Sequence, residues 1–145
     1  MFMETKEKVT RKVENLQKCI GYLRSKSNVP IEDIENNYEL RSAIERNLQL
    51  AIEICIDIGE MIISNIGVDR PENYRDVITI LGKNNILPLD FADDFARAAG
   101  MRNILVHAYD EIDLNFLKDV LDNQLVDFDV YIQHILDYLE GKREK

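Results

Sequence analysis

The sequence predicts an all-α protein, an up-and-down bundle of four main helices plus a short helix. Apolar residues recur at spacings of three and four along nearly the whole chain, which is the period of amphipathic helices. Proline (3) and glycine (6) are scarce, which disfavours a turn-rich β-sandwich. No repeat, low-complexity tract or long linker divides the 145 residues, so we expect one domain over residues 1–145.

The N-terminal segment, residues 5–24, predicts the first helix. Polar residues and Pro30 end it. A short turn is expected at residues 31–37, where Asn36 or Asn37 can cap the next helix. The first helix carries a single apolar stripe, made of Val9, Val13, Leu16, Ile20 and Leu23.

The second helix, residues 38–66, is the longest, and Gly67 is a plausible C-cap. Its apolar residues spread well beyond one stripe, because Leu50, Ile54 and Met61 lie off the main face. So broad an apolar circumference needs cover on two sides, inside a bundle or at a subunit interface. A homodimer is one arrangement that provides it.

Three further helical segments follow. A short helix is expected at residues 74–83 and another at 89–99, where Gly100 invites a kink before helical spacing resumes. Asp113 is expected to cap the last helix, which runs to residue 139.

Charge and cysteine content limit the possible functions. With 18 basic and 27 acidic residues the net charge is −9, so nucleic acid cannot be held by the whole surface and any contact must be local. Cys19 and Cys55 have no spacing that suggests zinc or a disulfide framework, and we expect no metal and no cofactor. No apolar leader or membrane span is visible, so we expect a cytoplasmic protein.

The segment from Arg102 to Tyr109 holds the candidate chemistry. Asn103 and His107 are i, i+4 neighbours on one helical face, and Arg102 and Tyr109 share an adjacent face. An imidazole that titrates near neutrality can take a proton from a ribose 2′-OH or return one to the leaving oxygen. A guanidinium can stabilise the charge of the phosphorane-like transition state. His107 and Arg102 therefore suit RNA cleavage without a metal.

Geometry sets a condition on that site. Positions five residues apart lie about 140° apart around a straight helix. Arg102 and His107 meet only if the helix bends near Gly100, or if two protomers each contribute a copy across a symmetric interface. On spacing alone, a structural role for this cluster is favoured over a catalytic one.

Two polar residues outside this segment are Asp57 and His134. Asp57 lies among isoleucines on the second helix and needs a cationic or hydrogen-bonding partner, for which Arg102 is the candidate. His134 is interpreted as a partly exposed residue of the last helix with no polar cluster beside it.

At Arg102, His107 and Tyr109 the sequence resembles the HEPN superfamily, and more closely its HepT-like toxin branch, which carries Arg, four residues, His, one residue, Tyr. Residues 40–53, 57–60, 70–74 and 99–107 resemble further blocks of the branch, so the similarity covers most of residues 38–139.

The resemblance implies an all-helical homodimer with a shared active site at its two-fold axis, and a metal-independent endoribonuclease used as a toxin. It also implies a minimal nucleotidyltransferase antitoxin of the MntA type, which transfers AMP from ATP onto the motif tyrosine, here Tyr109. Added phosphate beside Arg102 and His107 would occupy the anion site and exclude RNA.

Two alternatives stay open. One is a non-catalytic helical partner of a nucleotidyltransferase, with Tyr109 as the acceptor of modification or a wall of a nucleotide pocket. The other is a structural bundle with a buried Arg102–Asp57 pair and no site.

Overall fold

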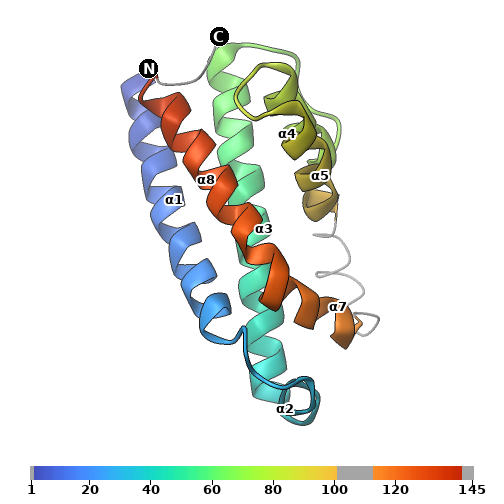
Figure 1. Cartoon of the computed structure of the whole chain (residues 1–145). Coiled ribbons are helices and arrows are strands. Elements are labelled where there is room, and N and C mark those ends of the chain that lie inside the picture. The colour runs from blue at the N-terminus through green and yellow to red at the C-terminus, as the bar shows by residue number, and fades with distance from the viewer. Residues whose placement is uncertain (1, 101–112, 142–145) are drawn as a thin grey trace.

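The computed structural model describes residues 2–100 and 113–141, and every regular element within these ranges is a helix (Figure 1). The elements are α1 (Phe2–Ser25), α2 (Ile31–Asn36), α3 (Tyr38–Ile66), α4 (Tyr74–Lys83), α5 (Leu89–Gly100), α7 (Leu114–Asp119), the π-helix η2 (Val120–Gln124) and α8 (Leu125–Leu139). The all-α prediction is confirmed for this part of the chain.

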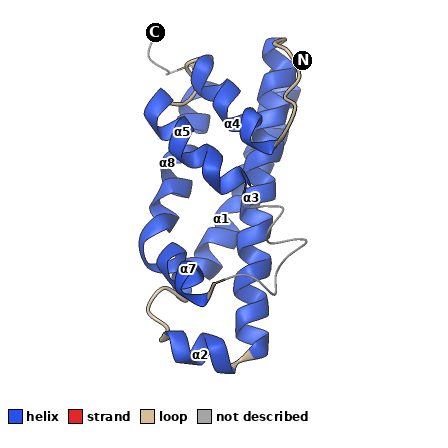
Figure 2. Cartoon of the chain, turned by 90° about the vertical axis from the view of Figure 1, so that its right-hand side faces the viewer, coloured by secondary structure: helices blue, strands red, loops and turns tan. Residues whose placement is uncertain are grey.

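The long helices α1, α3 and α8 form the body of the molecule, and the shorter pair α4 and α5 packs beside the upper half of α3 (Figures 1 and 2). α1 and α5 lie on opposite sides of α3 in Figure 1. α2 closes the end of the bundle far from the N-terminus (Figure 1).

Most of the expected helix ends are confirmed. Asn37 accepts a 3.0 Å hydrogen bond from the Leu40 amide and so caps α3. Gly67 ends that helix at φ 75°, a left-handed conformation that glycine adopts without steric cost. Asp113 caps α7 through a 2.9 Å hydrogen bond from the Asn115 amide.

Two elements differ from the sequence prediction. The expected turn after Pro30 is the six-residue helix α2, which holds its place because Ile34 is completely buried. The last helix runs without a break to Leu139 as expected, but it is not an α-helix throughout, since the π-helix η2 replaces the α-helix over Val120–Gln124. The Asp119 side chain accepts hydrogen bonds from Asn123 (2.8 Å) and Gln124 (2.5 Å), and a partner five residues ahead suits the wider turn of a π-helix. Apolar spacing alone gave no sign of this change.

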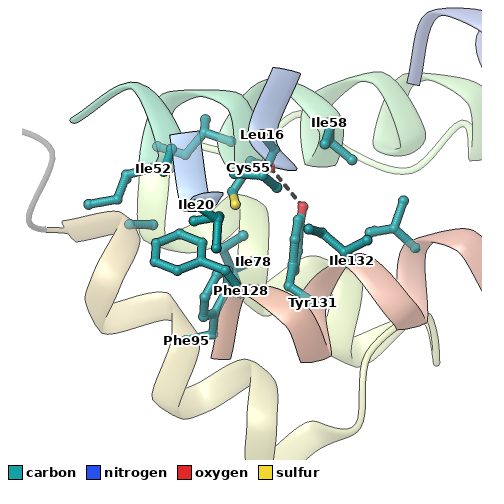
Figure 3. Packing of buried hydrophobic residues seen from close by; sticks show 14 of the residues in the cluster. Leu16, Ile20, Ile52, Cys55, Ile58, Ile78, Phe95, Phe128, Tyr131 and Ile132 are labelled. Carbon is teal, nitrogen blue, oxygen red and sulfur yellow. Dashed lines mark hydrogen bonds between the residues drawn. The ribbon is translucent and has the colours of Figure 1, made fainter. Parts of the chain in front are cut away.

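The core lies where α1, α3, α4, α5 and α8 meet, and Tyr131 of α8 stands at its centre (Figure 3). Tyr131 is completely buried, and its hydroxyl donates a 2.7 Å hydrogen bond to the Cys55 carbonyl of α3. Burial raises the pKa of Tyr131 well above its ordinary value, so the phenol stays protonated as this hydrogen bond requires. Burial likewise raises the pKa of the Cys19 and Cys55 thiols, which are free and enclosed in the core.

The apolar residues of α3 that lie off its main face are partly covered by other helices of the same chain. Leu50, Ile54 and Met61 are half-buried and pack against the core. The homodimer remains a prediction.

Candidate functional site

The residues of the predicted catalytic segment, Arg102, Asn103, His107 and Tyr109, lie outside the described residues. The expected kink after Gly100 falls outside them too. The structure describes the two helices that flank this segment in sequence, α5 before it and α7 after it.

Helix α5 is held firmly against the core. The amide of Ala92 donates a 2.9 Å hydrogen bond to the Pro88 carbonyl, which starts the helix where one was expected, at residue 89. A Cβ placed on Gly82 of α4 would lie only 2.6 Å from Ala92 Cβ, so α4 and α5 pack at closest approach there. These contacts fix the direction in which α5 leads toward residue 101.

Phe95 anchors the middle of α5 to α8. Its ring stacks on Tyr131 at 4.9 Å between centroids and meets Phe128 edge-on at 5.6 Å (Figure 3). Both arrangements are favourable aromatic geometries. The last turn of α5 therefore extends from a rigid support.

Two cations lie near the end of α5. Arg97 is an exposed residue whose Nη1 lies 3.9 Å from Asp94 Oδ1, a weak surface pair. The side chain of Arg75 of α4 packs against Gly100 at the end of α5. A Cβ on that glycine would lie 3.1 Å from Arg75 Cδ. Arg75 thus stands beside the residue that precedes the predicted catalytic segment by two positions. Sequence reasoning missed it, because only the packing of α4 on α5 brings it there.

Asp57 has the cationic partner that its surroundings required, and that partner is Lys12 of α1. Lys12 Nζ lies 3.1 Å from Asp57 Oδ2, and the two side chains are 39% and 47% exposed. The suggested partner Arg102 lies outside the described residues. On α3, Asp57 is five positions from Ile52 and so lies about 140° around the helix from it. Asp57 faces α1, whereas Ile52 lines a cavity beside α5.

His134 lies on α8 and is half-buried, with its ring 6.3 Å from the Phe91 ring. No group of three or more potential metal-ligating His, Cys, Asp or Glu side chains occurs among the residues that the structure describes. Within the same ranges, no helix combines the length and apolar character needed to cross a membrane.

Comparison with known proteins identifies the family. The family model described as ribonuclease HepT-like matches residues 14–135. The chain belongs to the ribonuclease HepT-like family. The match begins inside α1 and ends inside α8, so it takes in the helices of the core as well as the segment from Arg102 to Tyr109. The resemblance noted from the sequence is thereby confirmed.

Two HepT relatives are similar over almost their whole length. The mRNA nuclease HepT of Shewanella oneidensis is 28% identical over 127 residues, covering 88% of this chain and 95% of the relative. The tRNA nuclease HepT of Aphanizomenon flos-aquae is 29% identical over 131 residues, covering 90% and 89%.

A solved structure agrees with the fold of this HepT-like chain. The tri-AMPylated HEPN toxin of Shewanella oneidensis, in complex with MNT antitoxin, superposes with a TM-score of 0.80 at 28% identity. The comparison covers 88% of this chain and 96% of the toxin.

Proposed function

We propose that this chain is a metal-independent endoribonuclease toxin of a type VII-like toxin–antitoxin pair. The observation that carries the proposal is the family match over residues 14–135, with relatives named as nucleases that are covered over 95% and 89% of their length. RNA in the cytoplasm is the proposed substrate.

His107 acts as the general acid/base of the proposed reaction. It takes the proton of a ribose 2′-OH, whose oxygen attacks the neighbouring phosphorus and displaces the 5′-oxygen of the next nucleotide. An imidazolium returns a proton to that leaving oxygen, which yields a 2′,3′-cyclic phosphate and a 5′-hydroxyl. Arg102 stabilises the negative charge that builds on the phosphate oxygens. Asn103, on the helical face of His107, is a supporting group.

The proposed site is composite. On a straight helix Arg102 and His107 diverge, so Arg102 of one subunit and His107 of a second copy complete the site across a two-fold interface. Asp57 is a supporting residue of the fold alone, through its partly exposed pair with Lys12, which links α1 to α3.

Silencing of the proposed toxin is assigned to Tyr109. A minimal nucleotidyltransferase antitoxin transfers AMP from ATP to the Tyr109 hydroxyl, and pyrophosphate leaves. The new phosphate then occupies the anion site near Arg102 and His107. The likeness to an AMPylated toxin bound to MNT antitoxin supports this step.

The decisive experiment compares the two histidines. Purified wild type, His107→Ala and His134→Ala are incubated with total RNA in EDTA. Loss of a general acid/base is expected to slow cleavage by about 10²- to 10⁴-fold in His107→Ala, while His134→Ala cleaves as wild type does. Equal RNA loss in wild type and His107→Ala would mean that a contaminant cleaves the RNA, and the proposal would fall.

A second candidate is a non-catalytic partner of a nucleotidyltransferase, which the likeness to a toxin solved together with its MNT antitoxin also supports. Co-expression with a neighbouring nucleotidyltransferase, followed by mass spectrometry of wild type, Tyr109→Phe and Tyr38→Phe, separates the parts. AMP-sized additions that vanish only in Tyr109→Phe support modification at that residue. RNA cleavage by the unmodified dimer excludes the hypothesis of a non-catalytic partner.

A further inference from the structure

A cavity of about 510 Å³ lies between α3, α5 and the α7–α8 segment. Its volume is within the range of about 300–1,000 Å³ that is usual for small-molecule sites. The wall nearest the body of the bundle is apolar and comes from four buried or nearly buried side chains, Leu48, Ile52, Val120 and Phe128. Ile52 and Phe128 converge on this region from α3 and α8 (Figure 3).

One aromatic wall has a ring that is only half-buried. Phe116 of α7 lines the cavity, and none of the rings in the described part of the chain pairs with it. Phe95, which also lines the cavity, is already stacked on Tyr131. Phe116 can therefore offer a ring face to a flat ligand.

The mouth of the cavity is rich in hydrogen-bond acceptors. Asp94 and Asp127 bring two carboxylates, and Gln124 brings an amide whose nitrogen already donates to Asp119 at 2.5 Å, which leaves its oxygen as an acceptor. Burial, and to a smaller extent the nearby charge of Asp94, raise the pKa of Asp127. Among the described residues that line the cavity, the one cation is Arg97, whose Nη1 lies 3.9 Å from Asp94 Oδ1.

We infer that this cavity binds one unstacked guanine base of the RNA substrate, with Phe116 against its face and the Asp127 carboxylate on its Watson–Crick edge. The inference deepens the proposed ribonuclease function and rests on it for the identity of the substrate. Ala98 in the cavity wall stands four positions before Arg102. Because four residues of chain span at most about 14 Å, the main chain of Arg102 is no farther than that from Ala98.

Guanine fits the acceptors better than the other bases. Its N1–H and N2–H groups lie side by side, so one carboxylate can accept from both, as it accepts from both prongs of a guanidinium. Adenine and cytosine place one amino group beside an acceptor nitrogen, and uracil places its N–H between two carbonyl oxygens. An ionised carboxylate therefore meets repulsion at the edges of those bases.

A guanidinium from a basic protein segment is the main competitor for the same carboxylate. Arg97 competes with it for Asp94, since Arg97 Nη1 lies 3.9 Å from Asp94 Oδ1. Asp127 is left open to either ligand, and the Phe116 ring in the same cavity adds a stacking surface for a base. Guanosine and agmatine are therefore compared directly in the test.

The test uses phosphate-free probes, so that the proposed catalytic groups take no part. Methyl-labelled full-length protein is titrated with guanosine, inosine, uridine and agmatine, and the methyl signals of Leu48, Ile52 and Val120 are followed, with Val9 of α1 as a distant reference. Guanosine is expected to shift the cavity methyls saturably. Inosine, which lacks the N2 amino group, is expected to bind about tenfold more weakly, the loss of one hydrogen bond to a charged group. Uridine is expected not to bind measurably.

Matched variants assign the contacts. Asp127→Asn is expected to abolish the preference for guanosine over inosine, whereas Asp93→Asn, an exposed α5 residue outside the cavity lining, is expected to keep it. Phe116→Ala is expected to weaken guanosine about fivefold or more, because base–aromatic stacking is lost. No saturable shift with guanosine, or equal binding of guanosine and uridine, overturns the inference. Stronger binding of agmatine overturns it in favour of a basic protein segment.

Failure of the inference and failure of the proposed function are distinguishable. Guanosine binding is expected to be unchanged in His107→Ala, since the probe has no phosphate. If the protein cleaves RNA but does not bind guanosine, the ribonuclease function is supported and the base site is refuted. If the protein binds guanosine but cleaves no RNA, the cavity is a nucleoside site and the ribonuclease function is refuted.

Discussion

The Tyr131 hydroxyl donates a 2.7 Å hydrogen bond to the main-chain carbonyl of Cys55, which joins α8 to α3 at the centre of the core. The same tyrosine ring stacks on Phe95, so a single side chain connects both long helices to α5. The helix that leads toward Arg102 is thus supported by a buried polar contact as well as by apolar packing. Loss of this contact is therefore expected to weaken the support of α5, the helix that precedes the proposed site.

Tyr131→Phe removes the hydroxyl and keeps the ring. The α3 carbonyl loses a partner in a place that water does not reach, and we expect the free energy of unfolding to fall by about 1–2 kcal/mol. Chemical denaturation followed by circular dichroism measures it. Tyr38→Phe is the matched control, because Tyr38 is 83% exposed and should change nothing. A Tyr131→Phe protein as stable as wild type would show that the hydrogen bond contributes no net stability.

Two helical glycines should respond to alanine in opposite ways. A Cβ on Gly59 of α3 would collide with Val77 Cγ1 of α4, whereas a Cβ on Gly21 of α1 would meet nothing within 4 Å. We expect Gly59→Ala to destabilise the protein by about 1–3 kcal/mol through overpacking. Gly21→Ala is expected to stabilise it by up to about 1 kcal/mol through helix propensity. Thermal denaturation of both variants is the measurement, and a loss at Gly21 as large as that at Gly59 would contradict the close approach of α3 and α4.

Helix α3 was predictable from the sequence because it has a local signal at each end and apolar residues at helical spacing between them. Asn37 and Gly67 are such signals, and they act within one turn of the helix that they bound. η2 was not predictable in this way. Its wide turn depends on side-chain bonds to Asp119 and leaves the spacing of the apolar residues almost unchanged.

The candidate site was predictable only as far as its chemistry is local. His107, Arg102 and Tyr109 stand within eight residues of one another, so the sequence can bring them to notice. Arg75 lies far from them in sequence, and only the packing of α4 on α5 brings it beside Gly100. The Lys12–Asp57 pair joins positions 45 residues apart, on two different helices, so helical spacing could not reveal it. The sequence indicated only that Asp57 needs a partner, for which Arg102 was the candidate.

The Lys12–Asp57 pair should contribute little to stability. Both side chains are more than a third exposed, so water screens their attraction, and we expect a coupling energy of about 0.2–1 kcal/mol. A double-mutant cycle with Lys12→Met and Asp57→Asn measures it, and high salt should reduce it. RNA cleavage is expected to be the same in both single variants. A loss of cleavage confined to Asp57→Asn would instead place that carboxylate in contact with the reacting groups or with Arg102.

The pair of carboxylates at the cavity mouth should make stability depend on pH. Burial and the charge of Asp94 raise the pKa of Asp127 in the folded protein, so the folded state binds this proton more tightly than the unfolded state does. Ionised Asp127 therefore costs stability, in full above its folded pKa, and the cost disappears as the pH falls below the ordinary aspartate value of about 4. We expect Asp127→Asn to be more stable than wild type at pH 7, and the difference to vanish near pH 3.5. Asp93→Asn is the matched control with no such pH-dependent gain. Urea denaturation at a series of pH values gives both curves, and a gain in Asp127→Asn that persists unchanged at low pH would assign it to something other than the ionised carboxylate.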